Sequence, residues 1–74
     1  MKVTTDISNA LRKYRFLSGE LTQQELANKI GVSRQTIVAL EKGQYNPSVA
    51  LALRLAAFFK VNVEDLFQLT GEDQ

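Results

Sequence analysis

The sequence has 74 residues, of which 45% are hydrophobic and 23% are charged, and it contains neither cysteine nor histidine. A chain of this length forms one domain, close to the smallest size that a hydrophobic core alone can stabilise. Without cysteine and histidine there are no disulfides or thiolate metal sites, and the commonest general base and zinc ligand is missing. Composition therefore favours a single domain over residues 1–74 with no cofactor and no enzymatic activity.

Charge is distributed unevenly along the chain. The first 60 residues contain all nine basic residues and only four acidic ones, whereas the last eleven residues contain the other four acids. This asymmetry is typical of a protein whose N-terminal part faces a polyanion while its tail faces away.

No segment resembles a membrane span or a secretion signal. The longest apolar stretch, Val49 to Phe59, is interrupted by Arg54. It is far shorter than the ~20 residues that a spanning helix needs. The first residues lack the apolar core of a signal peptide. We expect a cytoplasmic protein with no membrane partner.

The first of five expected helices lies near the N-terminus. Residues 6–8 offer caps for a helix that runs to about Leu17, because Ile7, Leu11 and Tyr14 recur at helical spacing.

The second and third helices have sharper boundaries. Thr22 and Glu25 have the spacing of a capping box, which begins the second helix. This helix ends at Gly31, where a left-handed backbone costs glycine little. Ser33 then caps a third helix over residues 34–42.

Two further helices complete the chain. Pro47 marks a turn, after which Ser48 caps a fourth helix that runs to about Lys60. Asn62 caps a last short helix over residues 63–67. The pattern predicts an all-α fold.

Residues 22–42 combine the features of a helix-turn-helix. A tight connection at Gly31 and a small side chain at Ala27 let two helices cross at a steep angle. Five apolar side chains then share one core: Leu26, Ile30, Val32, Ile37 and Leu40. An ordinary helical hairpin needs the same glycine and apolar faces, so the core alone leaves that alternative open.

The outer face of the third helix separates the two interpretations. It mixes long hydrogen-bonding side chains with small apolar ones, which suits the major groove of DNA. The N-terminal residues of a recognition helix reach the bases first. We therefore predict that four residues read bases, with arginine matched to guanine and glutamine to adenine: Arg34, Gln35, Val38 and Ala39.

From about Leu11 to Phe67 the chain resembles the phage-repressor (Cro and Xre) helix-turn-helix family. The segments LTQQELA at 21–27, VSRQTI at 32–37 and LEKGQYNPS at 40–48 carry the resemblance. The most similar variants are compact single-domain regulators of the cytolysin-operon repressor type. The resemblance implies a five-helix, lambda-repressor-like domain that binds operator DNA as a dimer.

The resemblance also implies how the DNA backbone is held. Gln23 matches the family glutamine that bonds a phosphate and braces the first residue of the recognition helix, here Arg34. Phosphate contacts are implied for Thr22, Gln23, Ser33, Thr36, Lys42, Gln44, Tyr45 and Asn46. For Ser33, a role as a helix cap and nothing more remains an equal alternative.

A structural ion pair is implied between Arg15 and Glu41, in which an arginine of the first helix reaches the end of the third. Arg12 is a rival partner for this glutamate, because the first helix is displaced by one residue relative to some family members. Loss of one partner would leave an uncompensated, partly buried charge.

The C-terminal segment is more apolar than a short final helix can bury alone. Its candidate interface residues are Val63, Leu66, Phe67 and Leu69. The resemblance implies a dimerisation region over residues 61–70, and a short two-stranded ribbon in which residues 2–4 pair with residues 67–69. Alternatively, these side chains close the core of the monomer.

Together these features predict a homodimeric, sequence-specific repressor of a palindromic operator. Its partners would be double-stranded DNA and a second copy of itself, with no small-molecule ligand. The alternative is a protein-interaction or antitoxin module that uses the same fold. An enzyme is a distant third, since Glu64 and Asp65 lie beside no nucleophile or metal cluster.

Overall fold

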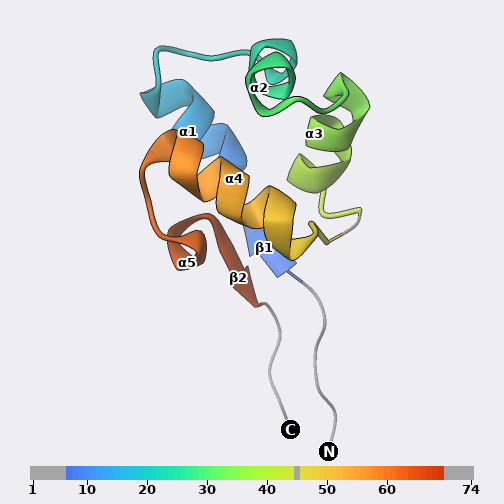
Figure 1. Cartoon of the computed structure of the whole chain (residues 1–74), viewed down its shortest axis with the longest axis vertical. Coiled ribbons are helices and arrows are strands. Elements are labelled where there is room, and N and C mark those ends of the chain that lie inside the picture. Colours follow the sequence, from blue (N-terminus) through green and yellow to red (C-terminus); the bar gives the residue numbers. More distant parts are fainter. Residues whose placement is uncertain (1–6, 45, 70–74) are drawn as a thin grey trace, which may run out of the picture.

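The computed structural model describes residues 7–44 and 46–69, and Figure 1 shows how its elements are arranged. Within these residues the chain forms five helices and a two-stranded antiparallel ribbon, as expected for a lambda-repressor-like domain. In chain order the elements are β1 (Ile7–Asn9), α1 (Leu11–Leu17), α2 (Gln23–Ile30), α3 (Arg34–Glu41), α4 (Val49–Phe59), α5 (Val63–Leu66) and β2 (Phe67–Leu69).

The predicted caps of the middle helices are confirmed. At α2 the Thr22 hydroxyl accepts from the Glu25 amide, and the Glu25 carboxylate accepts from the Thr22 amide. Gly31 ends this helix with a left-handed backbone at φ 87°. Ser33 caps α3 and Ser48 caps α4 by the same hydroxyl-to-amide geometry. These boundaries follow from local hydrogen bonds, which a sequence pattern can predict.

The predicted start of the first helix is wrong. Residues 7–9 form a strand rather than the first helical turn, so Ile7 is not part of the apolar face of α1. Asn9 accounts for the later start, because its side-chain oxygen accepts from the amide of Leu11 at 3.2 Å. The backbone of residues 7–9 is paired with a strand from the other end of the chain.

The ribbon joins the two ends of the chain but differs in detail from the expected one. Ile7 pairs with Leu69, and Asn9 pairs with Phe67. The predicted strand at residues 2–4 lies outside the described residues, and residues 7–9 take the place beside β2. The last helix therefore stops at Leu66, one residue earlier than predicted, because Phe67 is already extended.

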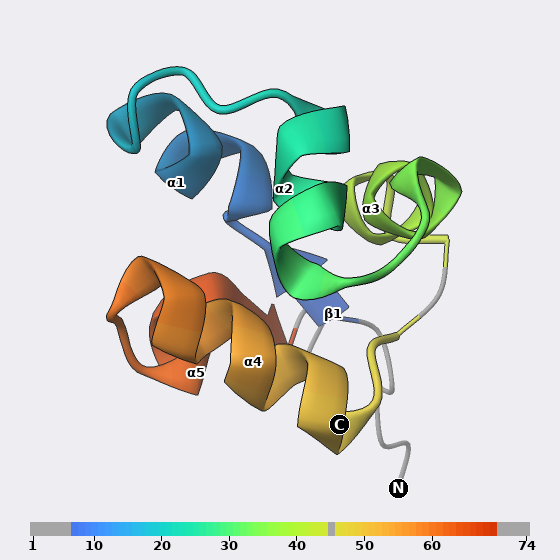
Figure 2. The same ribbon diagram turned by 45° about the horizontal axis from the view of Figure 1, so that its top comes forward.

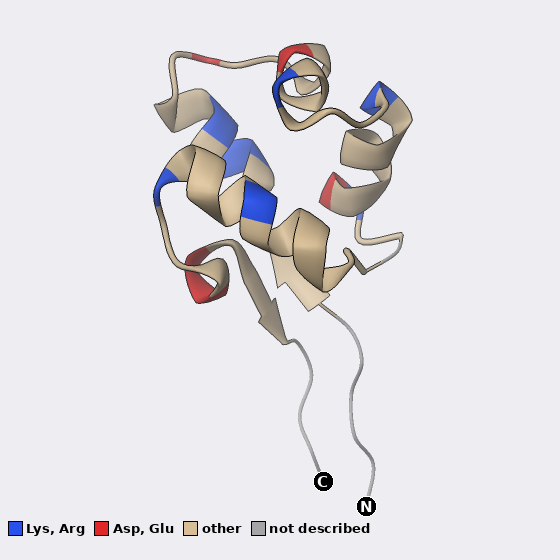
Figure 3. Cartoon of the chain, in the orientation of Figure 1, with Lys and Arg blue, Asp and Glu red and all other residues tan. Residues whose placement is uncertain are grey.

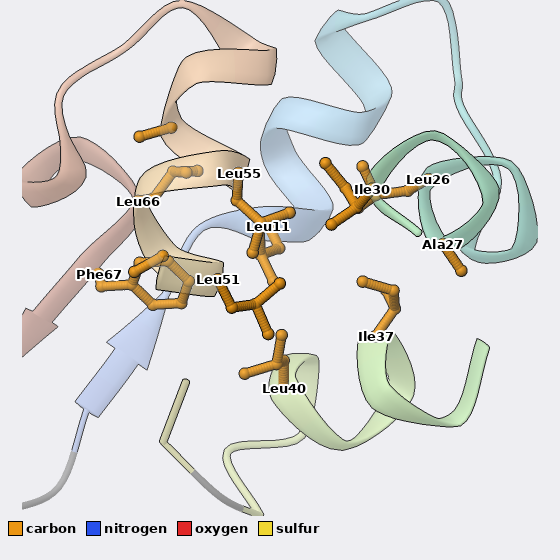
Figure 4. Packing of buried hydrophobic residues seen from close by; sticks show 12 residues of the cluster. Leu11, Leu26, Ala27, Ile30, Ile37, Leu40, Leu51, Leu55, Leu66 and Phe67 are labelled. Carbon is orange, nitrogen blue, oxygen red and sulfur yellow. The ribbon is translucent and has the colours of Figure 1, made fainter. Parts of the chain in front are cut away.

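The core lies where α2, α3 and α4 converge with the start of α1, as Figure 4 shows. Six large side chains are fully buried there: Leu11, Leu26, Ile37, Leu40, Leu55 and Leu66. Ala27 is also fully buried, as expected for the small residue at a helix crossing. Among the described residues, no helix is long and apolar enough to cross a membrane.

Candidate nucleic-acid interface

The α2–turn–α3 unit is held together by backbone and side-chain hydrogen bonds. The amides of Gly31 and Val32 both donate to the carbonyl of Ala27, at 2.8 Å and 3.0 Å, which makes the turn tight. The guanidinium of Arg54 on α4 donates to the carbonyl of Ile30, the last residue of α2. In Figure 2 α3 is seen almost end-on beside α2, so the two helices cross steeply.

The residues predicted to read bases lie along one side of α3. Arg34 and Gln35 are exposed in its first turn, and Val38 and Ala39 are half-buried one turn later. Two other apolar side chains of this helix, Ile37 and Leu40, are buried against the core. The exposed side therefore presents long polar groups at the N-terminus of the helix and small apolar groups behind them, which is the arrangement that suits a major groove.

Arg15 and Glu41 lie side by side beneath this unit. The Arg15 Nε donates to Glu41 Oε2 at 2.7 Å, and its Nη2 donates to Oε1 at 3.0 Å. The Arg15 Nη1 also donates to the carbonyl of Leu21 at 2.8 Å. Both side chains of the ion pair are only 10% exposed. The rival residue, Arg12, lies instead over the ring of Phe16.

Gln23 lies between the ion pair and the recognition helix. Its amide nitrogen donates to Glu41 Oε1 at 3.2 Å. Its amide oxygen accepts from Arg34 Nη2 at 3.4 Å. The structure thus places Gln23 next to Arg34, where the resemblance put it, and also next to Glu41.

Two of the residues predicted to bind phosphate, Thr22 and Ser33, are helix N-caps, and a third, Thr36, contacts Ser33. Thr22 belongs to the capping box, which lowers the pKa of Glu25 through the hydrogen bonds from the Thr22 backbone and hydroxyl. The hydroxyl of Ser33 accepts from the Thr36 amide and lies 3.1 Å from the Thr36 hydroxyl. Capping is therefore one role of Ser33, and it leaves lone pairs and hydroxyl protons at the surface.

The segment after α3 supplies the remaining candidates. Lys42 and Gln44 are exposed just beyond the helix. Asn46 is also exposed, and Tyr45 lies outside the described residues. In Figure 3 basic positions are spread over α1, α2, α3 and α4, and acidic positions occur on α2 and at the end of α3 as well as on α5. Among the described residues, neither sign of charge is confined to one side.

Two of the four residues predicted for the dimer interface do not have the expected exposure. Leu66 is 1% exposed and Phe67 is 9% exposed, so both close the core of the monomer, as the alternative interpretation held. Leu66 is the last residue of α5 and Phe67 is the first residue of β2, which pairs with β1, and both lie in the core cluster. Val63 is half-buried against the same core. Of the four residues, Leu69 is the most exposed, at 71%.

Two polar residues that the sequence did not single out attach the helix-turn-helix to the rest of the fold. Arg54 contacts the end of α2, and the Asn9 amide donates to the carbonyl of Leu40 at 2.6 Å. The interruption of an apolar helix by Arg54 was one signal that could have revealed it. Nothing in the sequence marks Asn9, whose partner is 31 positions away.

Comparisons with known proteins agree with this geometry. Residues 11–66 match the sequence profile of a family described as Helix-turn-helix. An uncharacterised HTH-type transcriptional regulator of Methanocaldococcus jannaschii is 56% identical over 61 residues, which are 82% of this chain and 91% of that protein. The cryptic phage CTXphi transcriptional repressor RstR of Vibrio cholerae is 37% identical over 59 residues, which are 80% of this chain and 52% of that protein.

A solved structure has a similar fold. It is the crystal structure of a candidate DNA-binding protein from Bacteroides fragilis, with a TM-score of 0.71 and 21% sequence identity. The match covers 84% of this chain and 98% of that one. At this identity the match concerns the arrangement of the helices alone.

Proposed function

This chain belongs to the Cro/Xre-type helix-turn-helix family of DNA-binding transcriptional regulators, which are not enzymes, and we propose that it is a homodimeric repressor of a palindromic operator. The observation that carries the proposal is the exposed side of α3, with Arg34 held at its N-terminus by Gln23. A guanidinium held in this way is prepared for bidentate contact with O6 and N7 of guanine. Gln35 reads a neighbouring adenine.

Phosphates on either side of the groove are bound by two groups of residues. At the start of α2 the amides of Gln23 and Gln24 have no partner within the helix, and with Thr22 they bind one phosphate. Beyond α3, Lys42, Gln44, Tyr45 and Asn46 bind the other strand, and Ser33 and Thr36 add contacts between them. Such contacts fix the register of the helix without reading the sequence.

Dimerisation is needed because one α3 covers only a few base pairs. Two recognition helices that enter successive major grooves lie about 34 Å apart, and a two-fold dimer gives the operator its palindrome. We propose that the two-fold contact is formed around the exposed end of the ribbon, at Leu69, with help from Val63. The name of the RstR relative supports repression over activation.

The alternative of a protein-binding or antitoxin module is less well supported. A helix that binds a protein partner usually presents an apolar face. The first exposed turn of α3 carries Arg34 and Gln35 instead.

The assignment of roles is tested with Arg34→Ala and Lys42→Ala on a duplex selected from a random pool. Arg34→Ala should lower discrimination at one base pair of each half-site, by about 1–3 kcal/mol. Lys42→Ala should weaken all sequences alike and reduce the salt slope of the binding constant by about 1 per protomer. Fluorescence anisotropy at several salt concentrations measures both quantities. Equal effects of the two substitutions on specificity would contradict the assignment.

A further inference from the structure

The geometry points to Glu41 as a positioning residue for sequence recognition: through Gln23, it orients the guanidinium of Arg34. The buried ion pair is then part of the DNA-reading apparatus as well as part of the core. This inference rests on the proposed function, because it concerns how Arg34 is prepared to contact a base.

The two groups that flank Gln23 have opposite hydrogen-bonding chemistry. A carboxylate only accepts hydrogen bonds, and a guanidinium only donates them. Gln23 has one accepting end and one donating end, so just one orientation of its amide satisfies both neighbours. That is the orientation observed, with the nitrogen 3.2 Å from Glu41 Oε1 and the oxygen 3.4 Å from Arg34 Nη2.

In the hydrogen-bonded chain from Glu41 through Gln23 to Arg34, the Glu41 side chain is the one held in place, because it is buried. Glu41 is 10% exposed and is held by two hydrogen bonds from Arg15, so it has little freedom to move. Arg34, by contrast, is exposed and is attached here by a single long hydrogen bond. The orientation is therefore transmitted outward, from the core to the recognition helix.

The same orientation serves the DNA backbone. The Gln23 amide nitrogen has two protons, of which Glu41 takes one, so the second remains for a phosphate oxygen. If the Gln23 amide were reversed, its oxygen would face the Glu41 carboxylate and its nitrogen would face the Arg34 guanidinium. Two acceptors would then meet at one end and two donors at the other. Glu41 thus excludes the orientation that would repel Arg34.

Replacement of the carboxylate weakens this selection. In Glu41→Gln one carboxylate oxygen becomes an NH2 group, so a single acceptor remains for three donors, Arg15 Nε, Arg15 Nη2 and Gln23 Nε2. An amide can pair with either end of Gln23, so the preference for the observed orientation of Gln23 is weakened. Because this variant also leaves the Arg15 charge without its partner, a second variant is needed that removes both charges.

The second variant is Arg15→Met combined with Glu41→Leu. Replacement of both members of a buried pair by apolar residues is often neutral or stabilising, whereas removal of one is costly. This double variant keeps the fold and leaves Gln23 without its buried acceptor. Asn9→Ala is the matched control, since Asn9 holds the same end of α3, at the Leu40 carbonyl, and touches neither Gln23 nor Glu41 in the described structure.

The measurement is binding to the selected duplex and to duplexes with one altered base pair. Wild-type discrimination at the base pair read by Arg34 should be about 5- to 150-fold. In Glu41→Gln and in the double variant it should fall toward the value of Arg34→Ala, and the loss should be less than additive when Arg34→Ala is added. Discrimination at the other base pairs, and that of Asn9→Ala at all of them, should stay as in wild type.

Two results would overturn the inference: discrimination retained in both Glu41 variants, or a loss that is uniform over all base pairs and additive with Arg34→Ala. A measurement without DNA separates this failure from failure of the proposed function. Nuclear magnetic resonance of the Arg34 Nε–H group should show greater side-chain mobility in both Glu41 variants than in wild type or Asn9→Ala. Equal mobility in all four proteins refutes the positioning role, even if no preferred duplex exists.

Discussion

At the scale of single residues, the ion pair between Arg15 and Glu41 is the contact on which the most depends. Its two side chains are 10% exposed, and Arg15 also donates to the Leu21 carbonyl in the loop before α2. The pair therefore joins α1, this loop and the end of α3. Because both charges have been removed from water, each depends on the other for its stability.

Arg15→Met alone should destabilise the protein by about 3–5 kcal/mol, because Glu41 is left buried with only Gln23 to donate to it. Addition of Glu41→Leu should recover most of that loss. Urea denaturation of the two variants and wild type, followed by circular dichroism, measures the free energies of unfolding. A double variant that is less stable than Arg15→Met would show that the pair is worth more than the apolar contacts that replace it.

At the scale of elements, the turn between α2 and α3 determines how the recognition helix is presented. Gly31 has φ 87°, and a Cβ built there would lie 3.3 Å from Arg54 Nη2. Gly43, after α3, has φ 71° and open space around it. Both glycines have a left-handed backbone, but only at Gly31 would a Cβ meet a neighbouring side chain.

Gly31→Ala should therefore cost more stability than Gly43→Ala. Both substitutions place a Cβ on a left-handed backbone, at about 1–2 kcal/mol. At Gly31 the new methyl group also crowds the guanidinium of Arg54, which must shift by a few tenths of an ångström beside the Ile30 carbonyl. Thermal unfolding of both variants compares the two costs, and equal values would mean that Arg54 moves aside freely.

The helices and strands differ in how well the sequence predicts them. The caps of α2, α3 and α4 rest on hydrogen bonds between residues three positions apart, so local patterns located them. The strand at residues 7–9 was missed because its partner, β2, lies at the other end of the chain. Its apolar and polar spacing also fits the start of a helix.

In the candidate site, too, some features could be predicted from the sequence and others depend on contacts between distant residues. The ion-pair partners and the neighbour of Arg34 were named through a resemblance, which transfers known spatial relations. The contact between Gln23 and Glu41 belongs to no local pattern, since the residues are 18 positions apart. The burial of Leu66 and Phe67 depends on how the ribbon folds back, which composition does not reveal.

At the scale of the whole molecule, the proposed homodimer needs a surface on which two copies meet. Leu66 and Phe67 are buried in the core, so Leu69 at the end of the ribbon is the most exposed apolar residue described in the predicted dimerisation region. The first and last described residues, Ile7 and Leu69, pair in this ribbon, which lies at the opposite end of the described fold from α2 (Figure 1). A two-fold contact here leaves both recognition helices free.

Leu69→Glu should shift the protein from dimer to monomer, since it places a charge in the proposed contact. Leu17→Glu is the matched control, because Leu17 is 70% exposed, close to the 71% of Leu69, and ends α1 far from the ribbon in Figure 1. Sedimentation velocity over a range of concentrations measures the association. If Leu17→Glu dissociates the dimer and Leu69→Glu does not, the contact lies at the other end of the molecule.

We propose that two copies of α3 read a palindrome in successive major grooves. The sharpest test is to select bound duplexes from a random pool with the wild-type protein and to sequence them. The protein should enrich an inverted repeat whose half-site centres lie about one helical turn, or 34 Å, apart. Recovery of no enriched sequence, or of a single site without a repeat, would contradict this proposal.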